Sequence, residues 1–166
     1  KQSNPDRKAI IMAYRKNQTN AQIVSLALSG NEGETTTGNM STEYRGHLGY
    51  AGATGHMPRA WERLYSARAA SRAVVRVIYS YNTPIAWLDR DYGWIIPDVS
   101  YSVTTSAKHQ SQLYRLNGRH ISAPWDATAE DMRRVLTGEL VFVTKGYGSS
   151  RAFTGTIPGP NYVEGA

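Results

Sequence analysis

The fold is decided by residues 73–104, AVVRVIYSYNTPIAWLDRDYGWIIPDVSYSVT. The hydrophobic pattern takes a period of two at Ala73, after which Val75, Val77 and Tyr79 fall on one face. Because successive side chains of a strand point to opposite faces, this alternation predicts a β-strand. The opposite face also carries apolar groups, which indicates that both faces of the strand are covered.

Three further strands are expected in the same stretch. The tripeptide Asn82-Thr83-Pro84 is a turn signal, and the apolar runs at 85–88 and 94–96 read as the next two strands. Residues 99–104 alternate between apolar and hydroxyl side chains and read as the fourth. Since the connections are too short for crossovers, the sequence predicts an antiparallel β-meander.

The segment before the meander is predicted to contain helices and a long loop. Asn4-Pro5-Asp6 is typical of a helix start, and Thr19 with Gln22 has the spacing of a capping box. We therefore expect a helical hairpin over 1–30. Residues 31–57 are rich in Gly, Thr, Asn and Ser and predict a long loop.

Helical periodicity returns on both sides of the meander. Helices are expected from Pro58 to about Ala70, from Thr104–Ser106 to Leu116, and over 128–137, followed by a short strand at 140–143. The chain is thus predicted to be one α+β domain over 1–150, with a helix, meander and helix core at 58–143. Residues 151–166 read as an extended Gly/Pro-rich tail, whose Ile157, Tyr162 and Val163 should dock on the domain or a neighbouring subunit.

Composition narrows the function classes. The 166 residues include no cysteine and carry a net charge of +6. Disulfides, thiolate zinc sites and thiol catalysis are therefore excluded for this sequence. No apolar run reaches the length of a membrane span, so we expect a soluble cytoplasmic protein without membrane partners. The positive charge favours a polyanionic partner, although mild basicity also serves solubility alone.

Two segments resemble a family of small uncharacterised proteins encoded by actinobacteriophages. They are SYNTPIAW, residues 80–87, and YSVTTSAKHQ, residues 101–110, with further pieces at 38–41 and 55–58. The sequence departs from the family pattern at Ala107, which is inserted before Lys-His-Gln. The resemblance implies a phage origin and the cytoplasm of the bacterial host, with the virion as the alternative. It implies no chemistry.

The junction between the fourth strand and its helix is the most specific candidate site. Hydroxyls precede the helix N-terminus and basic groups follow, a combination that suits phosphate. The candidate residues are Thr104, Thr105, Ser106, Lys108, His109, Gln112, Arg115 and Arg119. The competing interpretation is that the hydroxyls only cap the helix and the cations form a solvated face.

Other catalytic patterns are weak. The four histidines form no HxH, HxxxH or HExxH pair, and Gly-x-Ser-x-Gly and phosphate-loop spacings are absent. The first hypothesis is a non-enzymatic accessory protein that binds nucleic acid and needs no cofactor or metal. The second is a module that binds a host or phage protein or a second copy of itself. The third is a metal-dependent nuclease built on Asp89, Asp91 and Asp98.

Overall fold

Seven strands lie side by side in one sheet, in the same order as in the chain. The structure is a computed structural model that describes residues 14–146 and 151–164. The strands are β1 (Tyr14–Gln18), β2 (Glu32–Thr35), β3 (Met40–Tyr44), β4 (Val74–Ser80), β5 (Thr83–Asp89), β6 (Gly93–Pro97) and β7 (Arg119–Ile121). Strands β2 to β6 pair antiparallel, whereas β1 and β7 run parallel to their neighbours.

The predicted meander is confirmed for β4, β5 and β6. Ser80 pairs with Thr83, so a two-residue turn joins β4 to β5. The fourth strand expected at 99–104 is wrong, because the place beside β6 is taken by β7, where Ile95 pairs with Arg119. Residues 99–104 instead leave the sheet and lead into the next helical segment.

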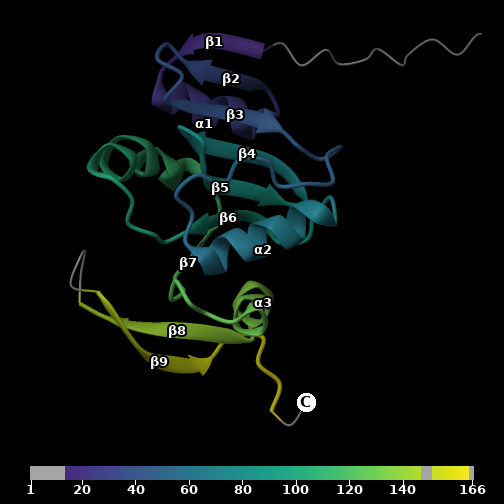
Figure 1. Cartoon of the computed structure of the whole chain (residues 1–166), viewed down its shortest axis with the longest axis vertical. Helices are drawn as coiled ribbons and strands as arrows, with labels where there is room; N and C mark the ends of the chain where they lie inside the picture. Colours follow the sequence, from purple (N-terminus) through teal and green to yellow (C-terminus); the bar gives the residue numbers. More distant parts are fainter. Residues whose placement is uncertain (1–13, 147–150, 165–166) are drawn as a thin grey trace, which may run out of the picture.

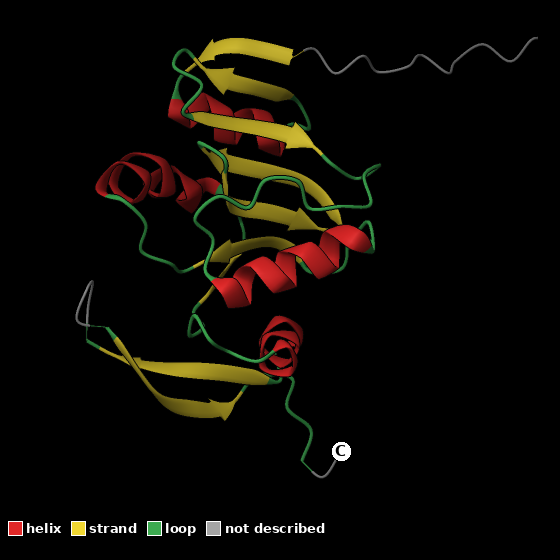
Figure 2. Cartoon of the chain, viewed as in Figure 1, coloured by secondary structure: helices red, strands yellow, loops and turns green. Residues whose placement is uncertain are grey.

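Helical segments cover both faces of the sheet (Figure 2). They are α1 (Asn20–Leu28), α2 (Arg59–Ala70), the π-helical turn η1 (Thr105–His109), the 3₁₀ segment η2 (Gln110–Arg115) and α3 (Ala129–Thr137). The apolar groups of α1 and η2 pack on one face, and those of α2 and α3 on the other. The predicted α+β class is confirmed, with helices outside a central sheet.

The sheet core follows from the period-two alternation. Val77 and Tyr79 join the cluster under α2, while Ile78 between them joins the cluster under α1. In β6, Ile95 faces α2, and Trp94 and Ile96 face α1. Because helices cover both faces, neither face needs polar residues, which explains the continuous apolar runs in the sequence.

Local capping sets the ends of α1. The capping box predicted for Thr19 and Gln22 is present, with the Thr19 hydroxyl accepting from the Gln22 amide. At the other end, the buried Arg76 guanidinium donates to the carbonyls of Gly30 and Asn31. Buried Arg76 thus joins β4 to the end of α1.

The expected N-terminal helical hairpin is only half right. Its second helix is α1, but Tyr14–Gln18 form β1, which pairs parallel with β2. The remainder of the expected first helix lies outside the described residues. The spacing of apolar residues that predicts a helix has little weight at Tyr14–Lys16, because these side chains are exposed and pairing with β2 holds the backbone in a strand.

The long loop expected over 31–57 contains two strands instead. In β2 and β3 the buried positions are Gly33, Thr35, Met40 and Thr42, so the alternation is carried mostly by small residues. Thr42 also donates its hydroxyl to the Val77 carbonyl at 2.9 Å. Composition alone therefore hides strands whose stability comes from the ladder to β4.

The C-terminal segments form an attached hairpin. The expected helix at 128–137 and its Thr128–Asp131 capping box are confirmed. Strands β8 (Leu140–Lys145) and β9 (Ala152–Pro158) then pair antiparallel apart from the main sheet (Figure 1). The tail is thus partly a strand. Ile157, Tyr162 and Val163 are exposed, but Asn161 next to them donates to the Thr137 carbonyl at the end of α3, and docking on a neighbouring subunit stays a prediction.

Candidate functional site

A pocket of about 540 Å³ opens between the β4–β5 turn and the segment that enters η1. Its walls consist mainly of hydroxyl, amide and aromatic groups, and the lining residues include no Asp or Glu. The lining residues are His56, Ser80, Tyr81, Asn82, Thr83, Ser100, Tyr101, Ser102, Thr104 and Thr105. The pocket therefore offers hydrogen bonds to an uncharged polar ligand rather than pairing for a cation.

A chain of buried polar side chains lies behind this wall. Ser102 donates to the Thr105 hydroxyl at 3.2 Å, and the Thr105 and Ser80 hydroxyls are 2.9 Å apart. The Ser80 Oγ lies 2.7 Å from Nδ1 of His109. Ser80, Thr105 and His109 are all buried, so each polar group needs the partner that the next one supplies.

The imidazole of His109 is kept in its neutral form. Burial lowers the pKa of His109 below its ordinary value, and the nearby Lys108 ammonium lowers this pKa further. A neutral imidazole has one acceptor nitrogen, and Nδ1 faces a hydroxyl. In the tautomer that carries its proton on Nε2, Nδ1 accepts the hydrogen bond from the Ser80 hydroxyl.

The mouth of the pocket carries backbone strain. Tyr81 has a φ of 54°, in the left-handed region that tight turns fill with Gly or Asn. Its ring is half exposed, and its centroid lies 5.9 Å from that of His109. An aromatic residue held in this conformation places a ring over the buried imidazole at the cost of local strain.

The loop that precedes α2 closes the other side of the pocket. The His56 amide donates to the Thr83 hydroxyl at 2.9 Å. Gly55 has a φ of 52°, and a Cβ at this position would overlap with Thr83. Gly55 is therefore required both by its conformation and by the close approach of the loop to β5.

The sequence-predicted site residues separate into two groups. Thr104, Thr105 and His109 belong to the pocket wall or its buried chain, and Ser106 accepts from the Tyr101 amide at 3.1 Å. No side chain among Thr104–Ser106 caps the helical segment; instead Ser102 accepts from the Thr105 amide. The expected regular helix is a π turn followed by 3₁₀ structure, with the Thr105 side chain buried and the side chains of Ser111 and Tyr114 exposed.

The remaining predicted residues lie outside the pocket. Lys108 and Arg115 are exposed, and the Arg115 guanidinium lies 5.7 Å from the centroid of the exposed Tyr114 ring. Gln112 is half-buried and contacts Ser111. Arg119 donates to the Val135 and Leu136 carbonyls at the end of α3, which fixes its guanidinium in a structural role.

Sequence reasoning missed Ser80, Tyr81, Thr83 and Ser102 as members of this site. Ser80 and Tyr81 read only as the end of the first strand, and Thr83 reads as part of the turn Asn82-Thr83-Pro84. The pairing of Ser80 with His109 spans 29 residues and carries no local spacing signal. The one available clue was an aromatic residue at the first position of a tight turn, where Gly or Asn is usual.

The three aspartates considered for a metal site are engaged by arginines. Arg68 donates to both oxygens of the buried Asp89 at 2.7 and 2.8 Å and also contacts Asp91. Asp98 accepts from Ser122 and Arg151, both at 2.7 Å. In the described part of the chain, no group of three or more metal-ligating side chains is arranged to hold an ion.

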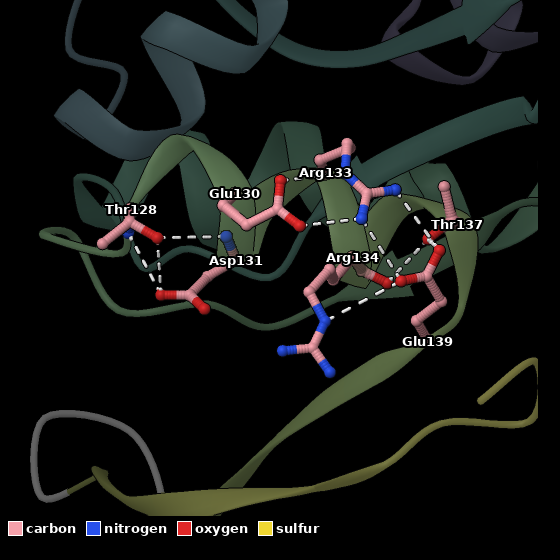
Figure 3. A network of polar contacts seen from close by, with 7 residues as sticks. All are labelled: Thr128, Glu130, Asp131, Arg133, Arg134, Thr137 and Glu139. Carbon is pink, nitrogen blue, oxygen red and sulfur yellow. Dashed lines mark hydrogen bonds and ion pairs between the residues drawn. The ribbon is translucent and has the colours of Figure 1, made fainter. Parts of the chain in front are cut away.

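A second charged cluster lies on α3, far from the pocket in the sequence (Figure 3). Arg133 pairs with Glu130 at 2.7 Å and with Glu139 at 3.3 Å, and Arg134 lies 3.7 Å from Glu139. A cavity of about 640 Å³ adjoins these side chains. Because these charges are on the surface and already paired with one another, the cluster contributes little to stability and presents paired rather than free charges.

Comparisons with known proteins agree with the extent of the main sheet. Within residues 14–146 and 151–164, no helix combines the length and apolarity needed to span a membrane. No curated protein and no solved structure matches the chain. A family model described as "Family of unknown function (DUF8033)" matches residues 8–123, which reach just past β7. Because this match covers most of its 166 residues, the chain belongs to that family of unknown function.

Proposed function

We propose that this protein binds single-stranded nucleic acid along η1 and η2 and needs no cofactor for this function. The observation that carries the proposal is the pair formed by Tyr114 and Arg115. Tyr114 is 71% exposed, and its ring lies beside the Arg115 guanidinium. An exposed ring with an adjacent cation offers a base a stacking surface and its phosphate a charge.

The charge of the surrounding segment supports the same partner. No Asp or Glu occurs between Asp98 and Asp126, while Lys108 and Arg115 are both exposed there. Ser111 and Asn117 are exposed polar neighbours that can contact sugar and phosphate oxygens. Because the segment itself contributes no carboxylate that would repel phosphate, its exposed Lys108 and Arg115 can act on the nucleic acid backbone.

The proposal also includes a biological setting. The segments at 80–87 and 101–110 resemble proteins encoded by actinobacteriophages. This resemblance supports a phage-encoded accessory protein that acts on nucleic acid in the cytoplasm of the bacterial host.

The direct test replaces the two cations together. Fluorescence anisotropy with labelled oligothymidylate at low salt should show weaker binding by Lys108→Ala/Arg115→Ala than by wild type. A variant with Arg59→Ala/Arg90→Ala loses the same charge elsewhere, since both residues are exposed on other elements. Equal binding by the three proteins would contradict the proposal, as would equal weakening in the two variants.

A second function is favoured by the β8–β9 hairpin, which is suited to pairing with a second copy of the chain. Every residue of β9 is exposed, and the strand Ala152–Pro158 carries no charge. Phe153 and Ile157 are exposed apolar groups on it. A two-stranded hairpin with an uncharged edge is an unprotected site for strand addition, and an identical strand can add antiparallel across a two-fold axis.

A further inference from the structure

We propose that Ser80 is a nucleophile for acyl transfer, with His109 as its general base, and that the pocket takes a small uncharged ester. This activity is independent of nucleic-acid binding on η1 and η2. The proposal rests on the 2.7 Å hydrogen bond between the Ser80 Oγ and Nδ1 of His109, in which Nδ1 accepts when the imidazole proton is on Nε2, and on the position of Ser80 in the pocket wall.

The surroundings of Ser80 hold its hydroxyl in one orientation. Thr105 contacts the Ser80 Oγ from one side, and Thr105 is itself held by Ser102. All three hydroxyl groups can therefore donate in one direction, which ends at the acceptor nitrogen of His109. A hydroxyl nucleophile within hydrogen-bonding distance of a neutral imidazole is the first element that covalent acyl transfer needs.

The pocket also has a polar group that its own protein leaves unused. The Tyr101 hydroxyl is buried and has no hydrogen-bond partner among the described residues, although Tyr101 lines the pocket. An unpaired buried hydroxyl is unfavourable unless a ligand or water completes it. The Tyr101 hydroxyl itself has almost no accessible surface, so an ester would reach it only after the side chain moves, whereas the half-exposed ring of Tyr81 lies at the mouth of the pocket.

The reaction balances with water as the only co-reactant. The Ser80 Oγ forms a bond to the ester carbonyl carbon while its proton passes to Nδ1 of His109. The C–O bond to the alcohol then breaks, and His109 returns the proton to the leaving alkoxide. Water attacks the acyl-Ser80 ester in the same way, its proton passes through His109 to Ser80, and a carboxylic acid leaves.

The test uses the full chain and a fluorophosphonate probe, which bonds to an activated serine with loss of fluoride. Intact mass and peptide mapping should place one label on Ser80. The rate of hydrolysis of p-nitrophenyl butyrate should decrease as the pH is lowered, because the imidazole becomes protonated. His109→Asn keeps a hydrogen-bonding group near Nδ1 but removes the base, so we expect a loss of about 100-fold or more in both reactions. Ser25→Ala, which removes an exposed serine of α1, should retain both.

Several outcomes would overturn the assignment. They are the absence of a label under conditions that label a known serine hydrolase, a label on another residue, and full reactivity of the His109→Asn variant. Thermal unfolding of each variant separates loss of reactivity from loss of fold. If His109→Asn does not fold, the mapped position of the label on wild type still decides whether Ser80 is the nucleophile.

Discussion

Ser80, the last residue of β4, is hydrogen-bonded at 2.7 Å to Nδ1 of His109, the last residue of η1. The bond connects the central strand of the sheet to the irregular segment that replaces the expected fourth strand. Because both residues are buried, the bond fixes the position of η1, and the burial lowers the pKa of His109 and so favours the neutral imidazole. The fold and the chemistry of the pocket therefore depend on the same contact.

The state of His109 predicts how stability changes with pH. Its pKa is lowered from the ordinary 6.5 by burial, so the unfolded chain takes up this proton at a higher pH than the folded protein does. The folded state binds fewer protons in this interval, and the free energy of unfolding therefore decreases as pH falls below about 6.5. Urea unfolding of wild type and His109→Asn should be measured at pH values above and below 6.5. The free energy of unfolding should decrease more steeply with falling pH for wild type than for the variant. Parallel curves would contradict the assigned state of the ring.

Removal of Thr105 should weaken the same region. Thr105→Val keeps the shape of the side chain but takes away the partner of two hydroxyls, Ser80 and Ser102. The expected decrease in the free energy of unfolding is about 1–3 kcal/mol, measured by urea titration. Thr36→Val, at an exposed turn position, is the matched control and should change little. A neutral Thr105→Val would mean that water replaces the lost bonds.

The Arg68–Asp89 pair should be the most important ion pair for stability among those described. Asp89 is buried and accepts two bonds from Arg68, whose own pKa is raised mainly by the hydrogen bonds to Asp89. Arg68→Ala leaves a buried carboxylate without its cation and should lower the free energy of unfolding by about 3 kcal/mol. Arg133→Ala removes an exposed pair on α3 and should leave the unfolding midpoint nearly unchanged. Equal effects would contradict the difference in burial.

How far the sequence predicts this fold depends on whether the signal is local. The alternation from Ala73 predicts β4 to β6, and the spacings Thr19–Gln22 and Thr128–Asp131 predict two capped helices. These patterns involve neighbours along the chain, whose geometry a strand or helix fixes. The capped helices and the meander were therefore predictable.

What the sequence hides is carried by distant pairing. Residues 99–104 have the alternation of a strand, but β7 occupies the place beside β6. β2 and β3 have the composition of a loop, yet the ladder to β4 makes them strands. In the candidate site, the sequence pattern points to Thr105 and His109 as phosphate-binding candidates, which stays a prediction, but their contact Ser80 comes from a different element, and no spacing along the chain predicts it.

The helix caps give a separate check on the local predictions. Thr128 accepts from the Asp131 amide at 3.0 Å and so satisfies one donor at the start of α3. Thr128→Ala should therefore lower the free energy of unfolding by about 1 kcal/mol. Thr128→Ser keeps a capping hydroxyl and should retain most of this contribution. Urea titration of the two variants distinguishes the loss of the cap from the loss of a methyl group.

The hairpin predicts a self-association that depends on its apolar edge. Phe153→Lys/Ile157→Lys places charges on β9 and should convert a dimer to a monomer, as measured by light scattering after gel filtration. Val103→Lys, at an exposed apolar position far from the hairpin in the sequence, should leave the dimer intact. A wild-type protein that stays monomeric at high concentration would contradict pairing with a second copy.

The salt dependence of nucleic-acid binding tests the central proposal most directly. Each phosphate contact to a single strand contributes about 0.7 to the slope of log affinity against log salt, so the loss of Lys108 and Arg115 should reduce this slope by about 1.4. The measurement is the anisotropy titration of oligothymidylate over a range of salt concentrations, with wild type, Lys108→Ala/Arg115→Ala and the Arg59→Ala/Arg90→Ala control. We predict a reduced slope for the first variant alone. No affinity of wild type at about 50 mM salt, or an unchanged slope in that variant, would contradict a phosphate-binding role for η1 and η2.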